Sequence, residues 1–200
     1  MTYYHNGLFF LNEHERAFIS GKCIIDAGAY QGESVIALLE ANPLRVIAFE
    51  LSPKNCCKME ANLQRNRIPK ERYELVSCGL GAVEEDICIN DTGEAITSRQ
   101  NEGDLSCHIT TIDKYTQLHP VQIGMLKADV EGDGLELIKG ALATIRRDRP
   151  ILSIAVYHSA DEFLGIPKFL ISNNLGYRFI LRSLSPFTTL GEIVLLGLPE

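Results

Sequence analysis

The stretch KCIIDAGAYQG, residues 22–32, decides the fold of this chain. It starts with a short apolar run that is typical of a buried strand and ends in a turn that contains Gly28 and Gly32. An amphipathic stretch follows the turn and stops at Asn42 and Pro43, which indicate the end of a helix. Strand, glycine turn and helix are thus consecutive, and a ligand can approach the backbone of such a turn closely because glycine has no side chain.

Strands and helices continue to alternate beyond this unit. Ser52 and Pro53 are typical of a helix start, where serine caps the helix and proline fits its first turn. Further strands are expected over residues 45–50, 73–78, 125–130, 151–157, 177–182 and 192–198. The alternation predicts a mainly parallel sheet with helices on both faces and with ligands bound at the carboxyl ends of its strands.

Local signals predict three features of the helices in the second half of the chain. A single helix is expected after the strand at 125–130, because apolar residues recur there at helical spacing, namely Leu135, Ile138, Leu142 and Ile145. Pro167 predicts the start of another helix. Asp113 is expected to cap a helix rather than to take part in catalysis.

We expect residues 1–200 to form one domain, because this length is close to that of a single compact fold. Residues 1–21 precede the first strand as an N-terminal extension. The alternation breaks at residues 84–110, which predict a hairpin with an acidic loop insertion. Residues 84–104 hold seven acidic residues and one basic residue. The loop is either a flap that closes on a substrate or a solvated loop.

Composition excludes several classes of protein. The chain has 19 Lys and Arg against 26 Asp and Glu, a net charge of −7, and lacks a long basic block, which argues against nucleic-acid binding. Its apolar runs are far shorter than the about 20 residues that span a membrane, and its start lacks the pattern of a secretion signal. The six cysteines form no C-x-x-C pair, so we expect reduced thiols and a cytoplasmic location.

Glu50 adds a second element to the glycine turn. It ends the second predicted strand, 22 residues after Gly28, where a carboxylate can accept both hydroxyl protons of a ribose. Together, the turn and Glu50 predict an adenosine site. In the alternative interpretation, Gly28 and Gly32 serve only strand–helix packing, Glu50 is a solvated strand end, and Asp26 is a helix cap.

Charge favours one adenosine compound over another. Asp26 lies beside the turn, where a dinucleotide would place its pyrophosphate, and the D-x-G-x-x-x-G pattern departs from the dinucleotide pattern G-x-G-x-x-G. Two like charges about 4 Å apart repel by on the order of 4 kcal/mol at an effective dielectric constant near 20. S-adenosylmethionine has no phosphate and carries an ammonium and a sulfonium. The acidic turn therefore favours S-adenosylmethionine over NAD.

Five motifs occur in a fixed order along the chain. They are IIDAGAYQGESV (24–35), VIAFELSPKN (46–55), TTIDKY (110–115), LKADVEGDGLELIKGA (126–141) and SIAVYHSADEF (153–163). In this combination the chain, from about residue 22 to its end, resembles the FkbM-type S-adenosylmethionine-dependent methyltransferases. Two departures are that Ala128 stands where isoleucine is commoner, and that EIVLLGLP at the chain's end follows the family only loosely.

The resemblance implies a three-layer α/β/α Rossmann-like class I methyltransferase, with a seven-stranded mainly parallel sheet whose last strand is antiparallel. It also implies methyl transfer from S-adenosylmethionine, usually to a hydroxyl of a sugar or natural product. By position, the cofactor's methionine part would contact Asp26, Gly28, Ala29 and Gly32, its ribose Glu50, and its adenine Leu51 and Ser52.

Three side chains near later strand ends are candidates for chemistry. Asp129 and Glu131 are expected to end the fourth strand, beside the strand of Asp26, and to point to the same side. A hydroxyl acceptor needs its proton removed, and Glu131, Asp129 and His158 are the candidate bases, in that order. Alternatively, Asp129 binds the cofactor's ammonium, Glu131 caps the helix that starts near Asp133, and His158 bonds a loop. We expect no metal, because tight ligand spacing such as H-x-x-x-H is missing.

Three functions from different classes remain at this point. The first is an S-adenosylmethionine-dependent methyltransferase acting on a hydroxyl of a saccharide or another small molecule, without a nucleic-acid or membrane partner. The second is an NAD-dependent oxidoreductase, supported by the strand–helix order and the ribose-binding acid but opposed by the missing G-x-G-x-x-G. The third is a methyltransferase-like binding protein that keeps the fold without turnover.

Overall fold

The computed structural model describes residues 3–93, 103, 105–184 and 192–200. Its α-helices are α1 (Glu13–Ile19), α2 (Glu33–Leu38), α3 (Pro53–Arg65), α4 (Ile112–Leu118), α5 (Gly134–Lys139), α6 (Leu142–Asp148) and α7 (Ala160–Ser172). Its strands are β1 (Cys23–Ala27), β2 (Val46–Phe49), β3 (Tyr73–Val76), β4 (Gly79–Leu80), β5 (Glu85–Ile89), β6 (Leu105–Thr110), β7 (Ile123–Ala128), β8 (Ile151–Ala155), β9 (Tyr177–Ser183) and β10 (Ile193–Pro199). Three short 3₁₀ helices are η1 (Tyr3–Phe10), η2 (Leu39–Ala41) and η3 (Lys70–Arg72).

Seven strands form the central sheet in the order β3-β2-β1-β7-β8-β10-β9. The neighbours from β3 to β8 pair in parallel, whereas β10 pairs antiparallel with both β8 and β9. The predicted fold class is therefore confirmed, including the antiparallel last strand. The chain leaves β1 in one direction toward β2 and β3, and returns on its other side with β7 and β8. The crevice where the strand order reverses, between β1 and β7, is where this architecture binds ligands.

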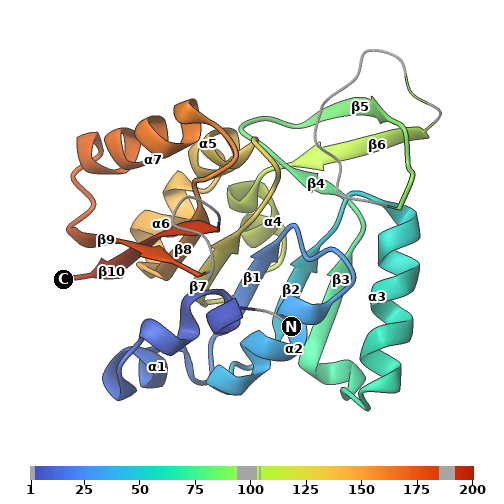
Figure 1. The fold of residues 1–200 in the computed structure, drawn as a ribbon, viewed down its shortest axis with the longest axis horizontal. Coiled ribbons are helices and arrows are strands. Elements are labelled where there is room, and N and C mark those ends of the chain that lie inside the picture. Colours follow the sequence, from blue (N-terminus) through green and yellow to red (C-terminus); the bar gives the residue numbers. More distant parts are fainter. Residues whose placement is uncertain (1–2, 94–102, 104, 185–191) are drawn as a thin grey trace.

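Helices cover both faces of the sheet, which gives three layers (Figure 1). Alternate residues of a strand point to opposite faces, and β1 shows this clearly. Ile25 packs into the core beneath α4, α5, α6 and α7, whereas its neighbour Ile24 packs into the core beneath η1, α1, α2 and α3. Both residues are completely buried, as expected of strands in the middle of a parallel sheet.

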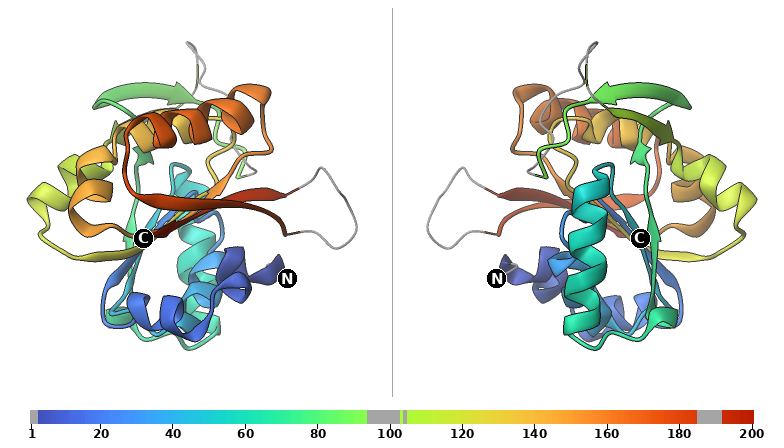
Figure 2. Two further views of the ribbon diagram at one scale, coloured as in Figure 1. Left: turned by 90° about the vertical axis from the view of Figure 1, so that its left-hand side faces the viewer. Right: turned by 90° about the vertical axis from the view of Figure 1, so that its right-hand side faces the viewer.

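The N-terminal extension packs onto the sheet. Leu8, Leu11 and Ile19 are buried in the core on the η1/α1/α2/α3 face, and the backbone oxygen of Asn6 accepts a hydrogen bond of 2.8 Å from Ser153 on β8. Figure 2 shows these first turns beside the end of β9 and the start of β10. The extension therefore adds buried side chains to the core on this face of the sheet.

The predicted hairpin at residues 84–110 is confirmed by β5 and β6, which pair antiparallel. They form a second, three-stranded sheet with β4, in the order β4-β6-β5. This small sheet lies beyond the carboxyl ends of β1 and β2 (Figure 1). The acidic loop that joins β5 to β6 lies mostly outside the described residues, as does the predicted flap.

Two helix predictions were wrong: the single helix over Leu135–Ile145 and the helix start at Pro167. The single helix expected over Leu135–Ile145 is two helices, α5 and α6, separated at Gly140. The carboxylate of Asp113 accepts hydrogen bonds of 2.9 and 2.7 Å from the backbone N–H groups of Ala143 and Thr144, in the first turn of α6. Asp113 is a helix cap, as predicted, but it caps a neighbouring helix. A methyl group on Gly140 would collide with the backbone oxygen of Gly81, so the break accommodates a close approach of two chain segments.

Pro167 does not start a helix, because it lies inside α7. The helix starts about two turns earlier, after Ser159, whose side chain accepts a hydrogen bond from the backbone N–H of Glu162. In the part of the chain that the structure describes, no helix is both long and apolar enough to cross a membrane. All six cysteines are free thiols.

Candidate active site

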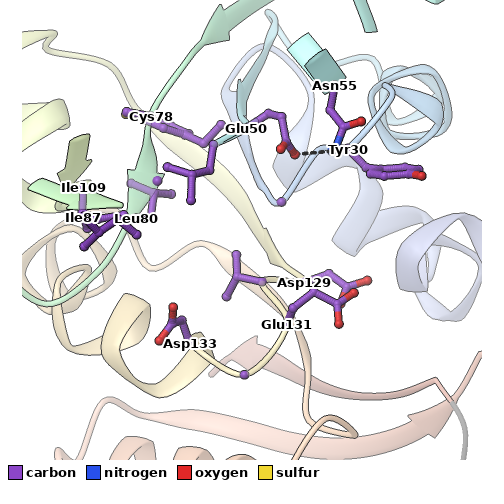
Figure 3. A pocket seen from close by; sticks show the side chains of 16 residues that line it. Tyr30, Glu50, Asn55, Cys78, Leu80, Ile87, Ile109, Asp129, Glu131 and Asp133 are labelled. Atoms are coloured by element: carbon purple, nitrogen blue, oxygen red, sulfur yellow. Dashed lines mark hydrogen bonds between the residues drawn. The ribbon is translucent and has the colours of Figure 1, made fainter. Parts of the chain in front are cut away.

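A pocket of about 480 Å³ opens at the carboxyl ends of β1, β2 and β7. Figure 3 shows the side chains that line it. Its walls come from the glycine turn after β1, the ends of β2 and β7, and Ile87 and Ile109 of the small sheet. A pocket of this volume at this place suits a small organic ligand. The sequence analysis did not foresee the wall made by the small sheet, because only the tertiary fold brings β5 and β6 over β2.

Glu50 lines this pocket directly after the end of β2, and it is buried. Its carboxylate accepts a hydrogen bond of 2.9 Å from the backbone N–H of Tyr30 (Figure 3) and another of 2.9 Å from that of Ser52. Burial raises the pKa of the Glu50 carboxyl above its usual value, although these hydrogen bonds work in the opposite direction. The side chain of Asn55 donates a third hydrogen bond to this carboxylate. Three of its about four acceptor sites are therefore taken, and one is left for a ribose hydroxyl.

The glycine turn approaches the loop after β7 closely. Gly28 has a φ of +73°, and a methyl group there would overlap the backbone oxygen of Asp129. Gly32 has a φ of +91°, and a methyl group there would lie 2.7 Å from the side chain of Met59. Both glycines therefore serve close packing, as the alternative interpretation held, while Gly28 also lines the pocket.

Asp26 does not face the pocket, because its side chain is completely buried beneath the turn. Its Oδ1 lies 2.9 Å from Nζ of Lys127 on β7, and its Oδ2 accepts a hydrogen bond of 2.6 Å from Ser34. Lys127 also donates to the backbone oxygen of Gly28 at 2.8 Å. No local signal in the sequence indicates this role of Lys127. Its charge neutralises Asp26, so the argument that Asp26 repels a pyrophosphate was wrong.

Four other carboxylates, rather than Asp26, make the pocket acidic. Glu50, Asp129, Glu131 and Asp133 line the pocket, and no Lys or Arg is among the described residues that line it. Acidic walls without a cation oppose a pyrophosphate and favour a cationic ligand. The predicted preference for S-adenosylmethionine over NAD thus depends on acidic residues that follow β2 and β7.

The predicted cofactor residues divide into two groups. Gly28, Glu50, Leu51 and Asp129 line the pocket, whereas Asp26, Ala29, Gly32 and Ser52 lie beneath it. Ser52 is a structural residue in this fold: its hydroxyl accepts a hydrogen bond from the N–H of Asn55 and donates one of 2.6 Å to Asp91. The latter bond ties the segment after β5 to the start of α3.

The three candidate bases come together in space. Nε2 of His158 lies 3.2 Å from Oδ1 of Asp129 and 3.6 Å from Oε2 of Glu131. The expected reason was wrong, however, because β7 ends at Ala128 and both acids follow it in a loop. Glu131 has a φ of +51°, a left-handed conformation that turns the chain there. Figure 3 shows the carboxylates of Asp129 and Glu131 side by side.

Glu162 holds His158 in place, and the sequence analysis missed it. Its side chain is almost completely buried, with Oε2 at 3.1 Å from Nδ1 of His158 and Oε1 accepting a hydrogen bond of 2.8 Å from the N–H of Gly134 at the start of α5. The four-residue spacing of His158 and Glu162 across a helix start was the available signal. In the alternative interpretation Glu131 was expected to cap α5, but Glu162 accepts the hydrogen bond at the start of this helix instead.

The acidic surroundings shift the pKa of two of these groups. Burial by itself would lower the pKa of the His158 imidazole, but contacts with the carboxylates of Asp129 and Glu162 and the charge of Glu131 raise it to about 10. Burial by itself would raise the pKa of Asp129, but His158 and Lys127 hold it below its usual value. At neutral pH, without a bound ligand, His158 is thus a cation that faces acidic groups.

A second pocket of about 480 Å³ adjoins the first. Tyr30 and Asp129 line both pockets and so mark the boundary between them. The second pocket is also lined by Asn6 of the N-terminal extension and by Tyr157, whose hydroxyl lies 3.3 Å from Oδ1 of Asp129. Two neighbouring pockets that share Asp129 can hold two reactants with their reacting atoms close together.

Comparisons with known proteins agree with this architecture. The family model described as the methyltransferase FkbM domain matches residues 26–179. The methyltransferase FkbM from Methylobacillus flagellatus KT is 22% identical, with a TM-score of 0.75 over 96% of this chain and 47% of its own. This chain therefore spans about half the length of that protein.

Two further solved structures share the fold at lower identity. An rRNA methylase from Streptococcus thermophilus is 14% identical, with a TM-score of 0.58 over 94% of this chain and 93% of its own. The fibrillarin of Aeropyrum pernix, which holds natively bound S-adenosyl-L-methionine, is 12% identical, with a TM-score of 0.54 over 96% of this chain and 71% of its own. No match was found among curated proteins.

Proposed function

Since the chain belongs to the FkbM methyltransferase family, we propose that it binds S-adenosylmethionine in the pocket between β2 and β7 and methylates a hydroxyl of a small molecule, such as a saccharide or natural product. The observation that carries this proposal is the position of Glu50. Its buried carboxylate is held by two backbone N–H groups and by the side chain of Asn55, in the wall of a pocket whose described lining has three further carboxylates and no Lys or Arg. A ribose with a cationic, phosphate-free substituent fits these walls.

The two pockets allow the cofactor and the acceptor to bind side by side, one in each pocket. Glu50 and Leu51 would hold the adenosine part in the first pocket, while the methionine part would extend toward Asp129 at the shared boundary. S-adenosylmethionine, when bound, supplies a methyl group on a sulfonium leaving group. The acceptor would enter through the second pocket, so that Tyr30 and Asp129 align the two reactants.

In this arrangement a carboxylate is the candidate general base that removes the acceptor's proton. His158, with its pKa raised to about 10, already carries a proton at neutral pH and is a poor base in the ligand-free protein. Glu131 lines the cofactor pocket near Asp129, which lines both pockets, and its side chain is 36% exposed, so it can reach a hydroxyl held at the boundary of the two pockets. Glu131 remains our first candidate for the base.

Calorimetric titration of the full chain with S-adenosylhomocysteine and, separately, with NADH tests the cofactor. We expect saturable binding of S-adenosylhomocysteine at sub-millimolar concentration and none of NADH. The reverse result would favour the oxidoreductase. Tight binding of S-adenosylhomocysteine without consumption of S-adenosylmethionine across a panel of hydroxylated acceptors would favour a binding protein without turnover.

A further inference from the structure

Asp129, Glu131 and His158 bring one imidazole nitrogen and two carboxylates to a single point at the boundary of the two pockets. The three potential ligand atoms all lie within 4.8 Å of one another. Ligands that sit about 2.1 Å from one ion lie roughly 3 Å apart when they are adjacent in its coordination shell. The separations of Nε2 of His158 from the two carboxylates, 3.2 and 3.6 Å, are close to this value.

The orientation of His158 is a second, independent observation. Only 10% of its side chain is exposed, and its Nε2 is buried without a well-formed hydrogen bond to any described residue. Because Nε2 lies 3.2 Å from Oδ1 of Asp129 without a well-formed hydrogen bond to it, this carboxylate lies off the axis of the nitrogen, and Glu131 is too distant for a hydrogen bond. This geometry suits three groups that face a common ion better than a hydrogen bond between any two of them.

Glu162 orients the imidazole of His158 as a metal ligand. A carboxylate only accepts hydrogen bonds, so the contact of 3.1 Å requires that Nδ1 of His158 carries the proton and donates it to Glu162. The other nitrogen, Nε2, is then the one available to a metal. A carboxylate behind a histidine ligand is the usual means by which proteins orient such a ligand. Glu162 is itself fixed by the N–H of Gly134.

We propose that Asp129, Glu131 and His158 bind one divalent first-row transition-metal cation, of which Mn²⁺ is the probe, and that this cation holds the acceptor's hydroxyl group. Three protein ligands leave coordination positions open for a substrate oxygen. The imidazole nitrogen favours such a cation over Mg²⁺, which prefers oxygen ligands. The cation takes the place of the proton that Nε2 carries in the metal-free protein. With the cation bound, Glu131 serves as a metal ligand, and the role of base proposed for it applies to the metal-free protein. The role of the cation toward the acceptor rests on the proposed function, but the binding of the metal does not.

The test measures Mn²⁺ binding to the EDTA-treated and dialysed full chain from the loss of the electron paramagnetic resonance signal of free Mn²⁺. We expect saturable binding of one ion per chain, with little displacement by a large excess of Mg²⁺. Glu131→Gln removes a charged ligand without changing the size of the side chain, and it should weaken Mn²⁺ binding by at least about tenfold.

A second variant, Glu162→Gln, tests the orientation of the imidazole. The N–H of Gly134 keeps the amide oxygen of the introduced glutamine on its side, so the amide nitrogen faces Nδ1 and donates to it. The proton of the neutral imidazole then moves to Nε2, which can no longer bind a metal. We expect a loss of about tenfold or more. The matched control is Glu136→Gln on α5, which removes one exposed negative charge paired with Lys139 and should leave Mn²⁺ binding unchanged.

Two further measurements distinguish a failure of the metal site from a failure of the proposed function. They are the binding of S-adenosylhomocysteine in the presence of EDTA and a thermal melt that shows whether each variant folds. Wild-type protein that binds S-adenosylhomocysteine but shows no saturable Mn²⁺ binding would overturn the metal site and leave the proposed function standing. Equal Mn²⁺ affinity in the wild type, Glu131→Gln and Glu162→Gln would also overturn it. Failure to bind S-adenosylhomocysteine, with Mn²⁺ binding intact, would instead overturn the proposed cofactor. If Glu162→Gln does not fold, Glu131→Gln decides the question alone.

Discussion

Nζ of Lys127 lies 2.9 Å from Oδ1 of Asp26, and both side chains are almost completely buried. This ion pair joins β1 to β7 at the point where the strand order of the sheet reverses. Because Lys127 also donates to the backbone oxygens of Ala27 and Gly28, it ties the glycine turn to the base of the crevice. The turn is therefore held from below by charge and hydrogen bonds rather than only by the packing of its glycines.

Lys127→Met should destabilise the protein by about 3 to 5 kcal/mol, because it leaves the Asp26 carboxylate buried without a countercharge. The double variant Asp26→Asn/Lys127→Met removes both charges and keeps an acceptor for Ser34, so it should recover a large part of this loss. Urea denaturation of the wild type and the two variants measures the difference. Equal stabilities of the single and double variants would show that the charge of Asp26 is not what Lys127 compensates.

Glu50→Ala should weaken the affinity for S-adenosylhomocysteine by about 1 to 3 kcal/mol, because it removes a charge-assisted hydrogen bond to the ribose. Titration calorimetry measures this change. Glu60→Ala is the control, since it removes a carboxylate of α3 that pairs with Lys70 and lines neither pocket. A Glu50→Ala variant with full affinity would remove Glu50 from the site.

The same affinity should depend on pH through Glu50. Burial raises the pKa of this carboxyl, so the ionised form that accepts a hydrogen bond from the ribose is present above the raised pKa and is lost as the pH falls through it. Affinity for S-adenosylhomocysteine should therefore decline as the pH falls below neutral, and the decline should begin at a higher pH than an ordinary glutamate would produce. In Glu50→Gln the component of the decline that is due to Glu50 should disappear. An identical decline in that variant would assign it to another group.

Gly28→Ala should destabilise the protein more than Gly21→Ala. The two glycines have similar positive φ angles, +73° and +76°, but a methyl group at Gly28 would overlap the backbone oxygen of Asp129, whereas nothing lies within 4 Å of one at Gly21. Gly21→Ala should cost about 1 to 2 kcal/mol for the left-handed conformation alone, and Gly28→Ala about 1 to 3 kcal/mol more. Chemical denaturation measures both. Equal losses would mean that the turn and the loop after β7 separate easily.

Cys78 should resist alkylation although it lines the cofactor pocket. Burial raises the pKa of its thiol to about 11, so the reactive thiolate is scarce near pH 8, while Cys57 is exposed on α3. Mass spectrometry after brief treatment with iodoacetamide should find the label on Cys57 and not on Cys78. In Cys57→Ser the main site of labelling should be lost. Modification of Cys78 at the rate of Cys57 would contradict the burial of this wall.

The sequence by itself determined the architecture and part of the site. The apolar runs around residues 22–27 and 45–50, the glycine turn and the Ser52-Pro53 helix start are local signals, because buried strands, tight turns and helix caps each need particular residues at particular positions. They were enough to predict the parallel sheet, the place of the pocket and the position of Glu50 in its wall. The ordered motifs were enough to indicate the family.

Only the tertiary structure decided which charges face the pocket and which are neutralised within the fold. Asp26 and Lys127 lie 101 positions apart in the chain, and Glu162 reaches Gly134 across 28, so no local pattern connects them. The break at Gly140 likewise depends on Gly81, a distant segment. The electrostatics of a buried site depend on distances of a few ångströms between groups that the chain brings together only on folding. For that reason the same sequence that predicted Asp26 as a cofactor residue could not show that it lies paired beneath the turn.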